Sequence, residues 1–367
     1  MKRFTLRLRA GAWRRTLAGA ALALTGTFAH AAVGLAGIAA TAPDGPITVY
    51  YPTDGTARPV VRGLFTLDLA VDAAPKAGNG RLVVVSHGSG GGAWTHADVA
   101  RALVDDGFVV AVPQHRGDSH GDDAHPGPDS WTIRPGEVVR AIDAVGRDPR
   151  FAPLLRLDKV GVYGMSAGGH TALSLAGGRW SPATFAHHCE AHLAEDFQSC
   201  VGLATRLTGS PLDGLRKWLA LAVIRHRFGA DDRPRSDGDP RIAAIVASVP
   251  FAADFDMSSL AQPRVPLGLV TVRHDRWLTP RFHGDRVLAA CRPCERLADL
   301  ADGGHGALLS PLPPGMTGLA GDMLNDPPGF ARAATMPAVD RKIAAFFGAH
   351  LAPLGAPAAT SMASANP

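Results

Sequence analysis

The sequence lacks the glycine-rich motifs that bind nucleotides. No G-x-x-x-x-G-K-[ST] pattern occurs in its 367 residues, and its glycines do not fit G-x-G-x-x-G. We therefore expect no nucleotide and no other cofactor. Charged residues are also scarce, at 19%, whereas 46% of residues are hydrophobic, a composition typical of globular rather than disordered proteins. The length suits one large α/β domain or two small ones.

Positive charge is scarce once the first 31 residues are set aside. The chain has 37 Lys and Arg against 33 Asp and Glu, but six of the basic residues and none of the acidic ones lie in residues 1–31. Taking those six away leaves 31 basic against 33 acidic residues, a net charge of about −2. A nucleic-acid partner requires a positive field, so we expect none.

Residues 1–31 have the pattern of a secretory signal peptide. Basic residues precede the apolar run Leu17–Phe28, which is followed by the cleavage pattern A-H-A. The run is too short and too rich in Ala and Gly for a membrane span. A pair of arginines before it leaves twin-arginine export open. We expect an exported protein, periplasmic or extracellular, that starts at Ala32 and keeps no membrane span.

The chain has only four cysteines. In an oxidising compartment this even number suggests two disulfides, and closeness in sequence favours Cys189–Cys200 and Cys291–Cys294 among the three possible pairings. A redox or metal role for the C-R-P-C pair is the alternative. A thioredoxin-like pair opens a helix directly after a strand, whereas this one follows a helical stretch, so we favour a structural role.

Two histidines four residues apart, His188 and His192, lie beside Glu190. On a helix they could share a metal ion. The sequence shows no third ligand for them, and surface histidines produce the same pattern, so we expect no metal.

Residues 159–178 have the pattern of a catalytic turn, K-V-G-V-Y-G-M-S-A-G-G-H-T-A-L-S-L-A-G-G. A short apolar run predicts a buried strand, small residues predict a helix, and G-x-S-x-G lies between them. Such a turn holds Ser166 in a strained conformation with its hydroxyl exposed, and Gly164 and Gly168 let strand and helix approach closely. A glycine-rich turn that only packs a helix on a sheet is the alternative.

A second glycine-rich loop, S-H-G-S-G-G-G, follows the apolar run Leu82–Val85. A tetrahedral oxyanion needs two backbone N–H donors, and residues without bulky side chains let the main chain approach it. The expected donors are the N–H of Ala167, directly after Ser166, and the N–H of Ser89 in this loop.

Strand and helix patterns alternate along the chain, which predicts right-handed crossovers and a mostly parallel sheet with helices on both faces. The predicted strands are Ile47–Tyr51, Leu64–Val71, Leu82–Val85, Phe108–Pro113, Val160–Tyr163, Ile242–Val249, Val265–Val272 and Glu295–Leu300. The predicted helices are Ala93–Asp106, Arg134–Arg147 and Asp340–Leu351.

The alternation breaks at residues 179–240, too long for an ordinary connection, so we interpret this segment as a cap inserted between core segments 32–178 and 241–351. Within it, Leu212–Phe228 is an amphipathic run. One face of that run either lines an acyl pocket or packs on the body: Leu215, Trp218, Leu219 and Val223. The tail, residues 352–367, is rich in Ala, Pro and Ser and is expected to be disordered.

A general base and its acid are expected late in the chain. His305 follows the last predicted strand in the loop G-G-H-G, the position where the base belongs. Asp275 follows the strand Val265–Val272 and suits the chain order Ser, Asp, His. Asp254 and Asp256, after the preceding strand, are alternatives.

Three loop acids are given no catalytic role and are interpreted as solvated or as acids of a calcium-binding type of loop: Asp118, Asp122 and Asp123.

Residues 47–347 resemble an α/β-hydrolase, nearest the dienelactone-hydrolase-like and platelet-activating-factor-acetylhydrolase-like esterases. The resemblance rests on Y-P-T, S-H-G-S-G-G, G-M-S-A-G-G, R-H-D-R-W-L-T-P and G-G-H-G. It implies Ser166 as nucleophile, Asp275 as acid and His305 as base, with N–H donors from Ser89 and Ala167. Dienelactone hydrolases themselves use a cysteine nucleophile. Acetylhydrolase-type members can carry the acid after the preceding strand, which keeps Asp254 open.

The sequence therefore predicts a secreted serine esterase that cleaves a small-molecule ester through an acyl-enzyme. The same three residues could instead cleave peptides or transfer acyl groups. Two other classes remain: a catalytically silent α/β-hydrolase used for binding, and a redox or metal protein centred on Cys291 and Cys294 or on His188 and His192.

Overall fold

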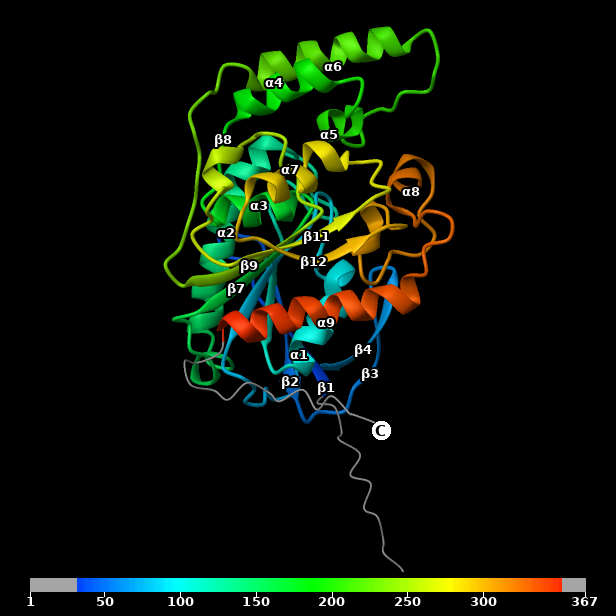
Figure 1. Cartoon of the computed structure of the whole chain (residues 1–367). Helices are drawn as coiled ribbons and strands as arrows, with labels where there is room; N and C mark the ends of the chain where they lie inside the picture. Colours follow the sequence, from blue (N-terminus) through cyan, green and yellow to red (C-terminus); the bar gives the residue numbers. More distant parts are fainter. Residues whose placement is uncertain (1–31, 352–367) are drawn as a thin grey trace, which may run out of the picture. The chain divides into compact units, whose positions relative to one another are not determined.

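A ten-stranded mixed sheet forms the centre of the computed structural model, which describes residues 32–351 (Figure 1). Its strand order is β12-β11-β9-β7-β5-β6-β2-β1-β4-β3. The strands are β1 (Ala32–Ile38), β2 (Ile47–Thr53), β3 (Arg58–Arg62), β4 (Phe65–Val71), β5 (Leu82–Ser86), β6 (Val109–Pro113), β7 (Val160–Met165), β9 (Ile242–Ser248), β11 (Leu267–Val272) and β12 (Glu295–Leu300). The expected signal peptide and the expected disordered tail lie outside the described residues.

Six neighbouring strands, from β6 through β5, β7, β9 and β11 to β12, are parallel, and β2 pairs with β6 in the antiparallel direction. All residues of β5, β7 and β11 are buried, as expected for strands covered on both faces. The predicted mostly parallel sheet is therefore confirmed. Two strands were not predicted from the sequence: β1 and the exposed edge strand β3.

Helices cover both faces of the sheet, as predicted. The apolar side chains of α1 and α9 join one core cluster, and those of α2, α3 and α7 join the cluster on the other face. The bounds are α1 (Ala97–Asp105), α2 (Pro128–Arg147), α3 (Ala167–Leu175), α7 (Gly284–Ala290), α8 (Gly318–Leu324) and α9 (Arg332–Leu351).

Two helices begin earlier than the sequence predicts. Helix α2 starts six residues before Arg134, and Pro135, expected in its first turn, lies inside it. The added turns bury Trp131, whose ring stacks on that of His170 at a centroid distance of 4.6 Å. An internal proline costs a helix about 3 kcal/mol, so this tertiary packing outweighs the local signal. Helix α9 likewise begins eight residues before Asp340 and contains Pro337.

The segment predicted as an inserted cap contains three helices that share the apolar core of α2 and α3. They are α4 (Pro182–His192), α5 (Phe197–Val201) and α6 (Asp213–Phe228), and they follow the short strand β8 (Arg179–Trp180), which pairs with β10 (Phe255–Asp256). Figure 1 shows α6 lying along α4, outside the sheet and its helices. No helix within residues 32–351 is both long and apolar enough to cross a membrane.

Both predicted disulfides are confirmed. Cys189–Cys200 joins α4 to α5, and Cys291–Cys294 closes the turn between α7 and β12. The four sulfurs are therefore bonded in pairs and hold no metal. This corrects the metal alternative for the second pair.

One buried carboxyl on α9 links stability to pH. Burial, and secondarily Asp98, raises the pKa of Asp340 to about 7 against the opposing charges of Arg332 and Arg341. The unfolded carboxyl ionises near pH 4 and the folded one near pH 7, so stability falls as pH rises between these values. Asp340→Asn is expected to be more stable than the wild type at pH 8 by on the order of 2–4 kcal/mol, with no gain near pH 4.

Urea unfolding at the two pH values measures this difference. Asp302→Asn, which removes an exposed acid, is the matched control and should change neither value by more than about 0.5 kcal/mol. An equal gain for Asp340→Asn at both pH values would contradict the linkage.

Candidate active site

Ser166 occupies a strained turn between β7 and α3. Its backbone angles are φ 57° and ψ −116°, a region that costs a residue with a side chain about 1–3 kcal/mol. Two backbone hydrogen bonds hold the turn: the Ser166 N–H donates to the carbonyl oxygen of Ser248, and the Phe251 N–H donates to that of Ser166, at 3.1 Å each. This geometry holds the residue in the strained position that the G-x-S-x-G motif predicts.

The two glycines of the motif are required by close backbone contact. A Cβ atom on Gly164 would overlap the carbonyl oxygen of Gly168, and one on Gly168 would overlap the carbonyl oxygen of Ser86. No rotation of a side chain could relieve either overlap because both obstacles are main-chain atoms. The end of β7 can lie this close to the start of α3 only because neither glycine carries a side chain.

Asp275 and His305 form a buried hydrogen-bonded pair. The imidazole Nδ1 and the carboxylate Oδ2 are 2.7 Å apart. The other carboxylate oxygen accepts the N–H groups of Trp277 and Leu278, both at 2.8 Å, which fixes the direction of the carboxylate. With its Nδ1 proton donated to Asp275, His305 presents the Nε2 lone pair as a proton acceptor.

The alternative acids lie elsewhere. Asp254 is fully buried and its Oδ2 is 3.1 Å from Nε2 of His170. Asp256 pairs with Arg179 at the surface. The structure therefore brings Asp275, and neither alternative, to His305.

Arg332 holds the loop that carries His305. Its guanidinium donates to the carbonyl oxygens of Gly306 and Leu309, at 2.7 Å each, and is itself held by Asp326 at 2.7 Å. Sequence reasoning missed Arg332 because it lies ahead of the predicted last helix and its partners belong to a loop about 25 residues earlier.

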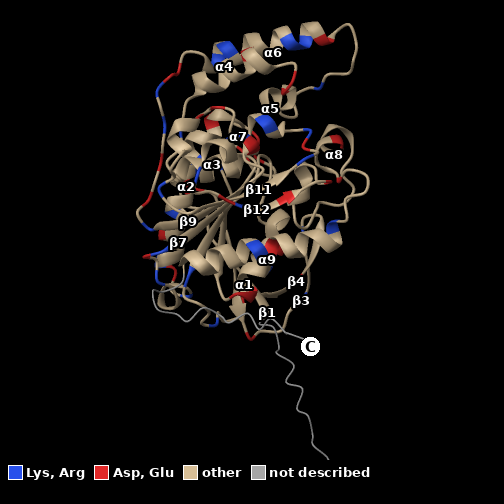
Figure 2. Cartoon of the chain, in the orientation of Figure 1, with Lys and Arg blue, Asp and Glu red and all other residues tan. Residues whose placement is uncertain are grey.

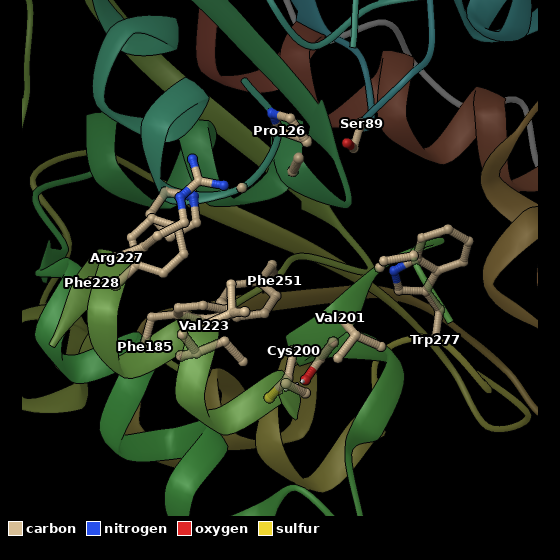
Figure 3. A pocket seen from close by; sticks show the side chains of 18 of the residues that line it. Ser89, Pro126, Phe185, Cys200, Val201, Val223, Arg227, Phe228, Phe251 and Trp277 are labelled. Carbon is tan, nitrogen blue, oxygen red and sulfur yellow. Dashed lines mark hydrogen bonds between the residues drawn. The ribbon is translucent and has the colours of Figure 1, made fainter. Parts of the chain in front are cut away.

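A cavity of about 510 Å³ opens in front of Ser166, between the sheet and the cap (Figure 3). Ser89 and Ala167 share its wall with Ser166. Much of the remaining wall is aromatic, formed by Trp131, Phe185, Phe228, Phe251 and Trp277. In Figure 3, Ser89 and Trp277 lie at one end and Phe185 and Phe228 at the other.

Trp277 connects this cavity to the acid–base pair. Its indole lines the cavity and stacks on the imidazole of His305, with ring centroids 5.7 Å apart and planes inclined by 21°. Within residues 32–351 no hydrogen bond joins the Ser166 hydroxyl to His305. Catalytic hydrogen bonds are often long without substrate, so the missing bond does not exclude the pair from a shared site.

Helix α6 of the cap contacts the cavity with only half of the apolar face predicted from the sequence. Leu219 and Val223 line the cavity. Leu215 and Trp218 do not, and they are 53% and 64% exposed. The prediction that all four side chains line a pocket or pack on the body is therefore wrong for these two.

Both residues expected to supply oxyanion donors, Ser89 and Ala167, line the cavity. Ala167 is the first residue of α3, so its N–H has no acceptor within the helix. The Ser89 N–H has no protein acceptor among residues 32–351, whereas its hydroxyl donates to Oδ1 of Asp118. The Gly90 N–H donates to the same carboxylate oxygen at 3.1 Å.

Asp118 is not the solvated loop acid that the sequence suggests, because it is 1% exposed. Its Oδ2 accepts from Arg134 at 2.7 Å and from the hydroxyl of Ser130 at 2.8 Å. Arg134 is fully buried and also donates to the carbonyl oxygen of His87 at 2.6 Å. Burial alone would raise the pKa of Asp118, but Arg134 and the Ser89 and Ser130 hydroxyls hold it below its ordinary value.

The buried Asp118–Arg134 ion pair holds both ends of the loop that carries Ser89. Removing the charge of Asp118 should therefore misplace the Ser89 N–H. Asp118→Asn is expected to lower kcat by about 10²-fold with KM changed less than about threefold, because the donor acts on the transition state. It should also cost about 3–5 kcal/mol of stability by leaving Arg134 unpaired. Ester turnover and urea unfolding measure both effects.

The matched control is Asp123→Asn, an exposed acid of the same loop, which should resemble the wild type. A stability loss with unchanged kcat would restrict Asp118 to a structural role.

Ser86, the last residue of β5, belongs to a buried serine–histidine–carboxylate arrangement. His115 Nε2 is 2.8 Å from the Ser86 hydroxyl, and its Nδ1 is 2.6 Å from Oε2 of Glu137. Ser86 and His115 are completely buried, and burial lowers the pKa of His115 well below its ordinary value while it raises that of Glu137. Because Ser86 and His115 are closed off from solvent, we interpret this cluster as a structural link between the end of β5, the loop after β6 and α2.

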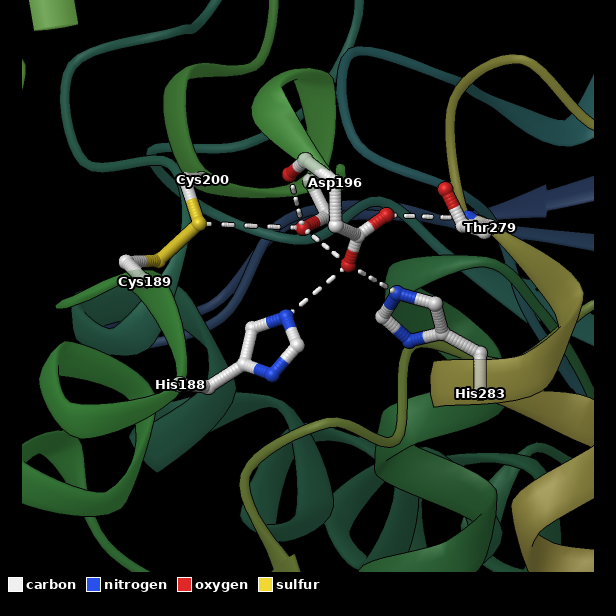
Figure 4. The surroundings of a disulfide bond; sticks show 7 residues. His188, Cys189, Asp196, Cys200, Thr279 and His283 are labelled. Carbon is white, nitrogen blue, oxygen red and sulfur yellow. Dashed lines mark hydrogen bonds and ion pairs between the residues drawn. A yellow bond between two sulfur atoms is a disulfide. The ribbon is translucent and has the colours of Figure 1, made fainter. Parts of the chain in front are cut away.

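The histidines of the cap require a correction. His188 is not a surface residue: it is buried, and its Nε2 lies 2.9 Å from Oδ2 of Asp196. The same carboxylate oxygen of Asp196 also accepts a hydrogen bond from Nε2 of His283, a residue of the core, at 2.9 Å (Figure 4). His192 and Glu190 are not part of this group, and Glu190 pairs with Arg225 instead.

The side chains of His188, Asp196 and His283 bring three possible ligand atoms close enough together to hold a metal ion. The position of the proton on His283 does not fit one. The Ala252 N–H donates to Nδ1 of His283 at 3.0 Å, so the neutral ring carries its proton on Nε2. A protonated nitrogen has no lone pair for a metal, and ligating histidines normally donate rather than accept at the other nitrogen. The cluster fits a hydrogen-bonded link between cap and core.

Comparison with known proteins supports the fold. No protein-family model matches the sequence, and no curated protein sequence does. Among solved structures, a ferulic acid esterase from Streptomyces cinnamoneus is similar, with a TM-score of 0.52 and 18% identity over 86% of this chain and 84% of that chain. The likeness to dienelactone-hydrolase-like and acetylhydrolase-like esterases stays a prediction. The chain has an α/β-hydrolase fold, with a mostly parallel sheet, helices on both faces and an inserted cap.

Proposed function

We propose that the protein is a serine hydrolase that cleaves carboxylic esters through an acyl-enzyme. The observation that carries this proposal is the buried Asp275–His305 hydrogen bond, which is linked through Trp277 to the cavity that Ser166 lines. A nucleophile on a strained turn, an imidazole with a free Nε2 and a carboxylate that fixes its tautomer are the groups that acyl transfer needs.

In the first half-reaction, His305 takes the proton from Ser166 as its oxygen attacks the ester carbonyl. The N–H groups of Ala167 and Ser89 stabilise the oxyanion that forms, and each such donor contributes about 3 kcal/mol. Asp275 stabilises the imidazolium without accepting its proton. The imidazolium then protonates the leaving alkoxide, and the acyl group remains on Ser166.

In the second half-reaction, water replaces the alcohol. His305 accepts a proton from the water molecule as the water oxygen attacks the acyl carbonyl. When the tetrahedral intermediate collapses, His305 returns the proton to the oxygen of Ser166. The carboxylic acid leaves and the enzyme is restored. No step requires a cofactor.

The cavity favours esters with a bulky apolar or aromatic group. Its volume of about 510 Å³ lies within the usual range of about 300–1,000 Å³ for small-molecule sites. Five aromatic rings in its wall offer stacking and edge contacts. The similar solved structure is named as an esterase of an aromatic acid, which agrees with this substrate class.

Export forms part of the proposal. The signal-peptide pattern of residues 1–31 and two disulfides are both typical of proteins in oxidising compartments. We expect the mature enzyme in the periplasm or outside the cell.

A panel of p-nitrophenyl esters with acyl groups of increasing size, assayed on the wild type and Ser166→Ala, tests this function. The wild type should hydrolyse the panel, prefer aromatic or long acyl groups, and react with a fluorophosphonate probe at Ser166. Faster cleavage of peptide amides would identify a peptidase, and preferred transfer to added alcohols an acyltransferase. If neither the probe nor any ester reacts, the proposal fails and the result favours the catalytically silent binding protein.

A further inference from the structure

The indole of Trp277 lies nearly parallel to the imidazole of His305. The two ring centroids are 5.7 Å apart and the ring planes are inclined by 21°. Within residues 32–351 no other aromatic ring stacks on this imidazole. His305 is 2% exposed, whereas Trp277 is half-buried and lines the cavity. The stack therefore joins the cavity wall to the proposed base.

The carboxylate of Asp275 holds both members of the stack. Its Oδ2 is 2.7 Å from Nδ1 of His305, and its Oδ1 accepts the backbone N–H of Trp277 at 2.8 Å. The N–H of Leu278 donates to the same Oδ1 at 2.8 Å, and the Leu278 side chain is buried. The acid that orients the imidazole thus also holds the turn from which the indole projects.

The stacked arrangement matters once the imidazole becomes charged. In the proposed reaction an imidazolium forms in each half-reaction, and its charge is spread over the ring. Asp275 offsets that charge at one edge, beside Nδ1. The face of an aromatic ring is negative and its edge is positive, so a cation within about 6 Å of the centroid of a Trp face is attracted. The small angle between the planes turns the face of the indole, and not its edge, toward His305.

We propose that Trp277 is a positioning residue whose indole face stabilises the imidazolium form of His305, and that it thereby sets both the rate of acyl transfer and the lowest pH at which the enzyme works. The proposal rests on the proposed function and adds a fourth residue to the machinery of that site. Trp277 acts through His305 and exchanges no proton itself.

A purely structural indole would have a different signature. A ring that only excluded water would destabilise the imidazolium, because charged groups are less stable away from water. Its removal would then raise the pH at which His305 loses its proton. A ring that attracts the imidazolium through its face has the opposite effect, so its removal lowers that pH. The direction of the change separates the two roles.

Other charges near the His305 loop set a common background for this comparison. Figure 2 shows acidic and basic residues on α9, which packs against the loop. The charged side chains around the loop that are at least partly buried are Asp98, Asp275, Asp326, Arg332 and Asp340. All of them are kept in the variants proposed below, so they do not contribute to a difference between variants.

The test compares Trp277→Phe and Trp277→Leu with the wild type. Phenylalanine keeps a smaller aromatic face, and leucine keeps an apolar side chain without one. For soluble p-nitrophenyl acetate, Trp277→Leu should lower the plateau of kcat/KM about five- to tenfold. The pH at which kcat/KM reaches half of that plateau on the acid side should fall by about 0.5–1 unit. Trp277→Phe should lie between the two, and it carries the test if Trp277→Leu does not fold.

The matched control is Phe228→Leu, which removes an aromatic ring from the opposite end of the same cavity (Figure 3). It is expected to change the preference for acyl groups, but to leave the half-plateau pH within about 0.2 unit of the wild type, because Phe228 does not stack on His305. A half-plateau pH that is unchanged or higher in both Trp277 variants would overturn the proposal and leave the indole a packing role.

A measurement without turnover separates this proposal from the proposed function. In a Ser166→Ala background, NMR follows the protonation of the His305 ring, whose signal is assigned by its loss in His305→Gln. The ring should take up its proton at a lower pH when Trp277→Leu is added. If no ester is hydrolysed by the wild type, the proposed function fails, yet this titration still decides whether the indole stabilises the imidazolium. Equal titration with and without Trp277 would overturn the proposal.

Discussion

Ser166→Ala and His305→Ala are each expected to lower kcat by about 10⁶-fold, with KM for a soluble ester changed less than about threefold. The oxygen of Ser166 forms the acyl bond, and without His305 no group removes its proton, so the loss of either stops the same step. What remains should come from the N–H donors at the cavity wall and from substrate binding, about 10³-fold over water.

The double variant should be no slower than either single one, because residues that act as a unit do not contribute additively. Steady-state hydrolysis of p-nitrophenyl butyrate measures all three proteins. Ser258→Ala and His187→Ala replace exposed residues of the same types and serve as matched controls. A Ser166→Ala protein that keeps a tenth of the activity would exclude it as the nucleophile.

The residues of this site could be found in the sequence because each one follows a strand with a recognisable pattern. Strands β5, β7 and β11 are continuous apolar runs, and the parallel sheet brings their carboxyl ends to one edge. Ser166 and Asp275 follow β7 and β11, and His305 follows β12, so topology alone predicts that the three lie near one another. The fold class followed from the same alternation.

The supporting residues could not be found in this way. Asp118 and Arg134 are a loop acid and a helical arginine in sequence, and nothing local shows that both are completely enclosed. Their pairing depends on α2 beginning six residues earlier than its proline suggests, a start that the packing of Trp131 decides. Burial of an ion pair depends on tertiary contacts, so no periodic pattern in the sequence reveals it.

The cap shows the corresponding limit for apolar residues. Periodicity detects that α6 has an apolar face, but it does not say which neighbour the face meets. One helical spacing joins four apolar side chains, and yet Leu219 and Val223 line the cavity whereas Leu215 and Trp218 do not and are exposed. Helix α4 lies along α6, and the contacts between them join residues about 35 positions apart, such as Glu190 and Arg225.

The second large effect on kcat is expected from a substitution of Asp275. Asp275→Asn should lower kcat by about 10⁴-fold at neutral pH. An asparagine there keeps the size of the side chain and can still accept the N–H groups of Trp277 and Leu278. Its amide can also donate to His305, which favours the tautomer with the proton on Nε2. That tautomer cannot take the proton of Ser166, so the fold is kept while the base is lost.

Asp254→Asn is the matched comparison, because it makes the same chemical change at the rival acid. The carboxylate there contacts His170 of α3 and not His305, so kcat should stay within about tenfold of the wild type. Its cost should instead be to stability, about 1–3 kcal/mol for a disturbed buried pair. Measuring kcat and urea unfolding for both variants separates the two roles. The reverse result, in which Asp254→Asn abolishes turnover and Asp275→Asn leaves it intact, would move the acid to the preceding strand while Ser166 and His305 keep their roles.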